Sequence, residues 1–166
     1  MLKYTTAQVV FREVPDEVTL AINISNCPIH CPDCHSKELW KDIGTELTQV
    51  ELDKLISENN GITCVAFMGG DSDPEYIQIL SKAIKEHYPE LKIAWYSGKD
   101  LKDIKISNMR YLDYIKTGPY KKGFPLNNPD TNQEFHKITK VRENKEGKLE
   151  VFVSYITHKF WNKESE

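Results

Sequence analysis

Apolar and polar positions along this chain form blocks that predict strands and helices in turn. Two stretches rich in β-branched residues, 6–11 and 18–25, predict a leading β-arm and a first core strand. Apolar residues at helical spacing, after a capping box that begins at Thr48, predict a helix over 48–59. The almost wholly apolar run 62–68 predicts a strand that is buried on both faces.

The same alternation continues through the middle of the chain. Asp73, followed by a proline suited to the first helical position, begins a predicted helix that runs to about His87. Further strands are predicted over 91–98 and 109–116, and a short helix after Ser36. An order of strand, helix, strand, helix, strand predicts a parallel sheet with right-handed crossovers.

After residue 117 the pattern changes. Residues 118–133 are dense in Pro, Gly and Asn and predict a long loop, and loops of this length inside small domains are usually functional. Residues 135–156 predict a terminal β-hairpin around an Asn-Lys-Glu-Gly turn. The chain has no internal repeat or linker, so we expect one domain over 1–166, too short for an ordinary eightfold α/β barrel.

Composition narrows the class of protein. With 39% hydrophobic and 28% charged residues the chain is typical of a soluble globular protein, and its net charge of -3 favours neither nucleic acid nor an anionic membrane as a partner. No apolar run approaches the roughly 20 residues that span a bilayer, and the N-terminus lacks a secretory signal pattern. We therefore expect a cytoplasmic protein.

The candidate chemistry lies between Asn23 and Trp40. Cys27, Cys31 and Cys34 form a C-x3-C-x2-C array directly after the first core strand, and the proline after each of the first two favours a loop. In a reducing compartment, thiols this close are typical of metal ligands rather than of disulfides. Closed zinc and ferredoxin-type centres have four ligands, so three local thiolates would leave one metal position open.

The fourth cysteine and two strand ends complete the candidates. Cys64 lies in an apolar segment, where a free cysteine is usually a small buried hydrophobe. Gly69, Gly70 and Asp71 follow a predicted parallel strand, at the edge where open α/β sheets bind ligands; the glycines allow close backbone approach and the carboxylate suits an ammonium group. An ordinary strand-to-helix turn has the same composition. Ser97 ends the next strand, either at the same rim or as a turn serine.

The cysteine array resembles the cluster-binding motif of the radical S-adenosylmethionine (SAM) superfamily. The resemblance implies an α/β fold, namely an open partial (β/α) barrel of about five or six mostly parallel strands, with a C-terminal β-hairpin. It also implies that Cys27, Cys31 and Cys34 hold three irons of a [4Fe-4S] cluster, while the fourth iron chelates the methionine part of SAM.

The resemblance extends to the other candidates. The Gly-Gly-Asp triplet is similar to the Gly-Gly-Glu motif that holds the amino group of SAM, with Asp71 one methylene shorter than the usual glutamate. Superfamily members commonly carry an aromatic residue before the last cysteine, where adenine packs, and here that position is Asp33. The resemblance implies that the backbone of Asp33, Cys34 and His35 lies beside the adenine, with Ser97 near the ribose or carboxylate.

Further features indicate a subfamily. The small size, the Gly-Pro-Tyr sequence and the segment Leu-Asn-Asn-Pro-Asp-Thr-Asn-Gln resemble the activating components of anaerobic (class III) ribonucleotide reductases. This implies reductive cleavage of SAM to a 5′-deoxyadenosyl radical that generates a glycyl radical on the large reductase subunit, with no catalytic side chain beyond the cluster and cofactor. The implied partners are that subunit, contacted by loop 118–133, and a low-potential electron donor such as flavodoxin or ferredoxin.

Three alternatives stay open. Another small radical SAM enzyme, such as the activase of a different glycyl radical enzyme, would share every cofactor residue. A zinc-stabilised protein-interaction module would use the three cysteines with His30 or His35 as the fourth ligand. A simple electron carrier would need four local cysteines, one more than this loop contains.

Overall fold

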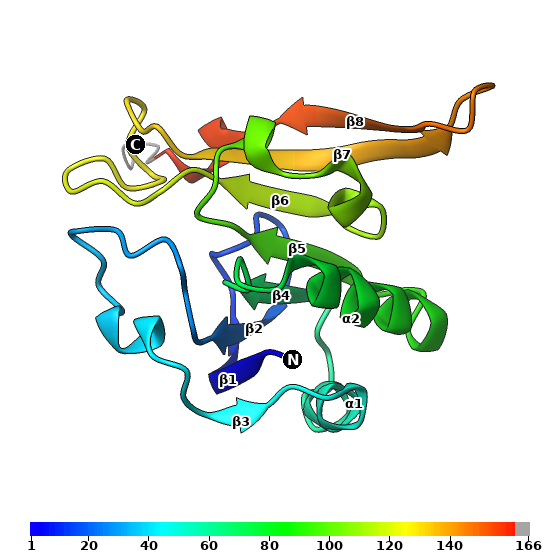
Figure 1. Cartoon of the computed structure of the whole chain (residues 1–166), viewed down its shortest axis with the longest axis horizontal. Coiled ribbons are helices and arrows are strands. Elements are labelled where there is room, and N and C mark those ends of the chain that lie inside the picture. The colour runs from blue at the N-terminus through cyan, green and yellow to red at the C-terminus, as the bar shows by residue number, and fades with distance from the viewer. Residues whose placement is uncertain (162–166) are drawn as a thin grey trace.

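The fold is one open sheet with two helices, and the computed structural model describes it for residues 1–161 (Figure 1). Residues 162–166, the end of the predicted domain, lie outside the described range. Within that range no helix is long and apolar enough to cross a membrane. The elements are β1 (Lys3–Val10), β2 (Thr19–Ile24), β3 (Thr45–Glu46), α1 (Gln49–Ser57), β4 (Cys64–Met68), α2 (Pro74–His87), β5 (Lys92–Tyr96), β6 (Tyr114–Thr117), β7 (Glu134–Glu143) and β8 (Leu149–Tyr155).

The sheet is only partly parallel. Its eight strands follow the order β3-β1-β2-β4-β5-β6-β7-β8, and β2, β4, β5 and β6 are mutually parallel. The remaining neighbours pair antiparallel. The expectation of five or six mostly parallel strands was therefore wrong in number and in direction. β7, β8 and the edge strand β3 join the same sheet, and only three of its seven neighbouring pairs are parallel. The two-residue β3 is fully exposed and has no alternation that could indicate a strand.

The two longer predicted helices are confirmed and begin at their predicted caps. The Thr48 hydroxyl accepts a hydrogen bond from the Glu51 N–H at 3.0 Å, and α1 follows. The Asp73 carboxylate accepts one from the Tyr76 N–H at 3.2 Å, with Pro74 as the first helical residue of α2. Each cap satisfies a backbone N–H that lacks a partner within its helix, which is why these local signals set the start.

Two predicted elements differ in the structure. The strand expected over 109–116 begins only at Tyr114, and a 3-10 helix, Ile106–Met109, precedes it. Met109 and Leu112 are buried in the core from this turn, so the apolar residues that suggested a strand pack without one. The short helix expected after Ser36 is a 3-10 helix, Lys37–Trp40, and the Ser36 side chain makes no capping hydrogen bond.

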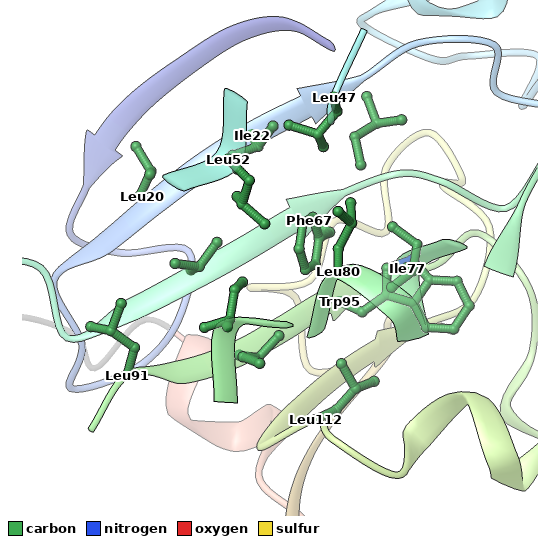
Figure 2. Close-up of a cluster of buried hydrophobic side chains, with 14 of the residues drawn as sticks. Leu20, Ile22, Leu47, Leu52, Phe67, Ile77, Leu80, Leu91, Trp95 and Leu112 are labelled. Carbon is green, nitrogen blue, oxygen red and sulfur yellow. The ribbon is translucent and has the colours of Figure 1, made fainter. Parts of the chain in front are cut away.

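The main core lies between the sheet and the two helices. Alternate residues of the central strands, such as Ile22 of β2, Phe67 of β4 and Trp95 of β5, are buried there. Figure 2 shows them packed with Leu52 of α1 and Leu80 of α2. Strands that bury this face place their other residues on the opposite face.

The opposite face carries small side chains on the central strands and the aromatic rings of Tyr114 and Phe135 beside them, and residues 11–18 help to cover it. Ala21, Ala66 and Ala94 are in register across β2, β4 and β5, and fully buried Val14 packs in the second cluster with the latter two. Glu17 fixes the covering segment, since its carboxylate accepts hydrogen bonds from the Lys92 ammonium at 2.9 Å and from the Tyr114 hydroxyl at 3.0 Å, among others.

This topology brings the candidate segments to one edge. Because β2, β4, β5 and β6 are parallel, the loops that follow them leave the sheet at the same end. In Figure 1 the loop after β2 and loop 118–133 both emerge at the left of the sheet.

Candidate metal centre

The cysteine loop is tied into a ring at its base. The Asn26 N–H donates to the Lys41 carbonyl at 3.0 Å, and the Cys27 N–H donates to the Leu39 carbonyl at 2.9 Å. Asn26 and His30 adopt left-handed backbone conformations, with φ of 59° and 50°, which turn the chain sharply. The segment between β2 and β3 is therefore a compact loop whose two ends are hydrogen-bonded to each other.

All three cysteines of the loop are half-buried. The Cys34 N–H donates to the Cys31 carbonyl at 3.0 Å, and the Ser36 N–H lies 3.4 Å from the Cys34 sulfur as a donor. Among residues 1–161, no three side chains of His, Cys, Asp or Glu are gathered in an arrangement that holds one metal ion. Joint ligation by Cys27, Cys31 and Cys34 therefore stays a prediction from their spacing.

Both histidines of the loop contact aromatic rings. The His30 ring stacks on Trp40, with centroids 4.6 Å apart and planes 13° apart, and the Lys37 ammonium lies 5.6 Å from the same indole centroid. His35 meets Tyr120, the first aromatic residue after β6. The two residues considered as a fourth zinc ligand thus each have a partner outside the cysteines.

The glycines after β4 are required by the fold itself. Gly69 and Gly70 have φ of 113° and 102°, and a Cβ at Gly70 would lie 2.6 Å from the Ile77 Cδ1 of α2. The Gly69 carbonyl accepts a hydrogen bond from the Trp95 indole at 2.9 Å. The sharp turn is thus what an ordinary strand-to-helix connection needs. It leaves Gly69 half-exposed at the rim and Gly70 buried.

Asp71 and Ser97, two of the predicted cofactor residues, are brought together in the structure. Asp71 is only 6% exposed; its carboxylate accepts hydrogen bonds from the Ser97 hydroxyl at 2.5 Å and from the Gly98 N–H at 2.8 Å. The Ser97 oxygen in turn accepts from the Lys99 N–H at 3.1 Å. The Asp71 carboxylate therefore holds the turn after β5, and any ligand ammonium would share it with these two donors.

That turn supports the cysteine loop. A Cβ at Gly98 would lie 2.8 Å from the Ile29 Cγ1, so the absence of a side chain there lets the cysteine loop pack against the end of β5. The contacts therefore run from Asp71 through Gly98 to Ile29, which lies between Cys27 and Cys31.

Lys116 is a residue of this edge that the sequence analysis did not single out. It lies at the end of β6, is 9% exposed, and donates to the Gly118 carbonyl at 2.9 Å and to the Ser97 carbonyl at 3.4 Å. Burial lowers the pKa of its ammonium to about 8, although the charges of Cys31, Asp71 and Cys27 oppose this shift. The predicted strand 109–116 also contains Arg110 and Asp113, so its sequence does not distinguish Lys116 from a solvent-facing strand residue.

The other candidates lie apart from this network. Cys64 is fully buried in β4, as expected for a small hydrophobe, and burial raises the pKa of its thiol to about 12. Asp33 is exposed. A hollow of about 790 Å³ lies apart from the predicted metal and cofactor residues; it is lined by Arg12, Pro15, Asp16, Asn127, His158, Lys159, Phe160 and Trp161.

The donor set fits an iron-sulfur cluster. Three half-buried thiols in one loop, beside a buried ammonium, are the soft anionic ligands that such clusters use. A family model described as a 4Fe-4S single cluster domain matches residues 17–154, which include the whole cysteine loop and the parallel strands. A search of curated proteins and a search of solved structures gave no significant match.

Proposed function

Because the chain belongs to the 4Fe-4S single cluster domain family and is an iron-sulfur protein, we propose that it is a radical SAM enzyme that activates anaerobic ribonucleotide reductase. The observation that carries this proposal is the position of two motifs. The cysteine loop follows β2 and the Gly-Gly-Asp turn follows β4, and these neighbouring strands are parallel, so both motifs open at one edge.

In this proposal Cys27, Cys31 and Cys34 hold three irons and leave the fourth for SAM. A closed four-cysteine centre would carry electrons only, whereas an open iron can bind a substrate. Cys64 is an unsuitable fourth ligand because its thiol is buried in β4 and its raised pKa disfavours the thiolate that metals bind. The Lys116 ammonium offsets the negative charge that the thiolates bring to the edge of the sheet.

The Gly-Gly-Asp turn would orient the methionine part of SAM. Gly69 is half-exposed at the rim and Gly70 is buried beneath it, and the neighbouring Asp71 carboxylate is already fixed by two hydrogen bonds. A fixed carboxylate loses little side-chain entropy when it accepts an ammonium group, which favours binding in one orientation. Ser97 is then a positioning residue that acts through Asp71.

The bound groups supply the reaction, and the chain supplies their placement. When bound, the reduced cluster would pass one electron to the sulfonium of SAM, giving methionine and a 5′-deoxyadenosyl radical that takes a hydrogen atom from the Cα of a glycine. No side chain has to act as a general base, since a hydrogen atom is transferred rather than a proton. A low-potential carrier such as flavodoxin or ferredoxin would deliver the electron.

Loop 118–133 is the proposed contact for the large reductase subunit. It emerges at the same edge as the cysteine loop (Figure 1), and its tip exposes Lys121, Lys122 and Phe124, the last at 44%. Exposed cations around an exposed aromatic ring suit a partner surface that carries acidic and apolar groups. Replacing these three residues together should abolish capture of the large subunit in a pull-down, and unchanged capture would remove this role.

The decisive test measures the products of SAM. The protein is reconstituted anaerobically with iron and sulfide, reduced, and given SAM, and 5′-deoxyadenosine is quantified for the parent, Cys31→Ala and the matched control Cys64→Ala. We expect product from the parent and the control and none from Cys31→Ala. With the large subunit added, a glycyl radical signal in electron paramagnetic resonance is expected.

The same preparation separates the alternatives. Product without a glycyl radical on this reductase would retain the radical SAM chemistry and assign a different target. A colourless protein with one zinc and no 5′-deoxyadenosine would overturn the proposal in favour of the zinc-stabilised interaction module.

A further inference from the structure

The cysteine loop and loop 118–133 meet at one pair of side chains. The His35 Nε2 and the Tyr120 hydroxyl lie 2.9 Å apart, within hydrogen-bond distance, and the two rings have centroids 5.0 Å apart with planes tilted by 59°. His35 directly follows the last cysteine, and 85 residues separate the pair in sequence. His35 is exposed and Tyr120 is half-buried, so ring surface remains accessible.

Tyr120 is held in place by the base of its loop. The Gly118 N–H donates to the Lys99 carbonyl at 2.7 Å, and the Pro119 carbonyl accepts from the Asn132 side chain at 3.0 Å. Gly118 has a φ of 95°, and a Cβ there would lie 3.1 Å from the Asn132 carbonyl oxygen. The two residues before Tyr120 are therefore tied to the turn after β5 and to the far end of their own loop, and these contacts fix the backbone from which the ring projects.

We propose that His35 and Tyr120 form a stacking platform for the purine base of SAM. This inference rests on the proposed function. The position before Cys34 is Asp33, an exposed carboxylate that offers no ring. Tyr120 brings an aromatic surface to the same end of the loop from a distant part of the chain.

The geometry suits a planar ligand. Two rings joined by a hydrogen bond keep their relative tilt, so a base that packs on either ring does not have to order both side chains. Stacking of a base on an aromatic side chain tolerates any orientation of the base edge, and its strength comes from the ring rather than the hydroxyl. The platform therefore contributes affinity for the adenosine part and none for the methionine part.

The test is binding without reductant, so that SAM stays intact. Isothermal titration calorimetry on cluster-loaded protein under anaerobic conditions compares SAM, 5′-deoxyadenosine and L-methionine. The variants are Tyr120→Leu, which removes the ring, Tyr120→Phe, which removes only the hydroxyl, and His35→Ala. Tyr155→Leu is the matched control, because Tyr155 is an exposed tyrosine whose ring also meets a histidine, His136, at 5.5 Å.

Loss of the tyrosine ring should weaken SAM and 5′-deoxyadenosine by about fivefold to a hundredfold and leave methionine unchanged. Tyr120→Phe should retain most of the affinity, and Tyr155→Leu all of it. Circular dichroism establishes that each variant is folded, and iron content establishes that it holds the cluster. If Tyr120→Leu does not fold, the affinities of His35→Ala for SAM and 5′-deoxyadenosine test the platform instead.

The outcomes separate this inference from the proposed function. Tight SAM binding by the parent and by both Tyr120→Leu and His35→Ala would overturn the platform while leaving the proposed function intact. Tyr120-dependent binding of 5′-deoxyadenosine without any binding of SAM would retain the two rings as a purine site and overturn the proposed function. A parent that binds neither ligand would overturn both.

Discussion

Replacing Lys116 with methionine tests the charge at the centre of this edge. The ammonium is 9% exposed, and burial lowers its pKa from 10.5 to about 8. At about 1.4 kcal/mol per pKa unit, keeping the ammonium charged in the folded chain at neutral pH costs about 3 kcal/mol. Methionine has a similar length and no charge, so the variant removes this cost while it leaves the Gly118 and Ser97 carbonyls without their lysine donor.

The pH dependence of stability isolates the charge from those lost hydrogen bonds. Because the folded pKa lies below the unfolded one, between about pH 8 and 10.5 the unfolded chain keeps a proton that the folded chain has released. The free energy of unfolding therefore rises with pH across this window in the parent, by about 2 to 3 kcal/mol, through Lys116 alone. The raised pKa of Cys64 has the opposite effect, but it is present in both proteins and cancels in the difference.

Urea unfolding of the metal-free chain measures this difference, under anaerobic conditions with a thiol reductant. We expect the parent to gain about 2 to 3 kcal/mol relative to Lys116→Met between about pH 7 and about pH 10. Lys137→Met, at an exposed position of β7, should follow the parent. If the parent and Lys116→Met show the same pH dependence, Lys116 is not held as a desolvated ammonium, and the positive charge assigned to the site is wrong.

Three other predictions concern the turn after β4, the covering segment and the cluster ligands. The reference variant for the turn is Gly61→Ala, at a glycine before β4 that has a φ of 85° and no atom near the position of a Cβ. This variant should lower the free energy of unfolding by about 1 kcal/mol in urea. Gly70→Ala should cost at least about 1 kcal/mol more, because its Cβ would meet a side chain of α2 at 2.6 Å. Burial raises the pKa of Glu17, but hydrogen bonds from three side chains outweigh it and hold this pKa below 4.5. The contribution of Glu17 to stability is therefore present above pH 4.5 and is lost as the pH falls through the lowered value. In Glu17→Gln, the melting temperature should fall less steeply at acid pH than it does in the parent. Cys64→Ala should keep the parent's iron and sulfide content after reconstitution, whereas Cys31→Ala should lose most of it; equal iron content would contradict the ligand set.

The Asp71 carboxylate has two roles to fill. Asp71 was expected to contact the ammonium of SAM, and in the structure its two oxygens accept from Ser97 and Gly98. A carboxylate oxygen has a second lone pair, so both roles are compatible in hydrogen-bond terms. Calorimetry with L-methionine on a further variant, Asp71→Asn, tests the ligand role. We expect weaker binding of L-methionine than in the parent, and equal binding would contradict a contact between the carboxylate and the ammonium.

The sequence alone determined the features that depend on neighbouring residues. Thr48 and the Asp73-Pro74 pair set the starts of both helices because each cap satisfies backbone groups within a few residues. The apolar run around Cys64 predicted a buried strand, and the family match to an iron-sulfur domain agrees with the cysteine spacing. Such signals are local in the chain and need no knowledge of which segments later meet.

Only the tertiary structure decided what gathers at the edge of the sheet. Lys116, Tyr120 and Asp71 come from three different strand ends or loops, and their partners lie 19, 85 and 26 residues away in sequence. The antiparallel continuation of the sheet through β7 and β8, and the two-residue β3, were likewise set by pairing with distant strands. Hydrophobic periodicity reports which face of an element is buried but not which element covers it, and burial by those partners is what lowers the pKa of Lys116 and brings His35 to Tyr120.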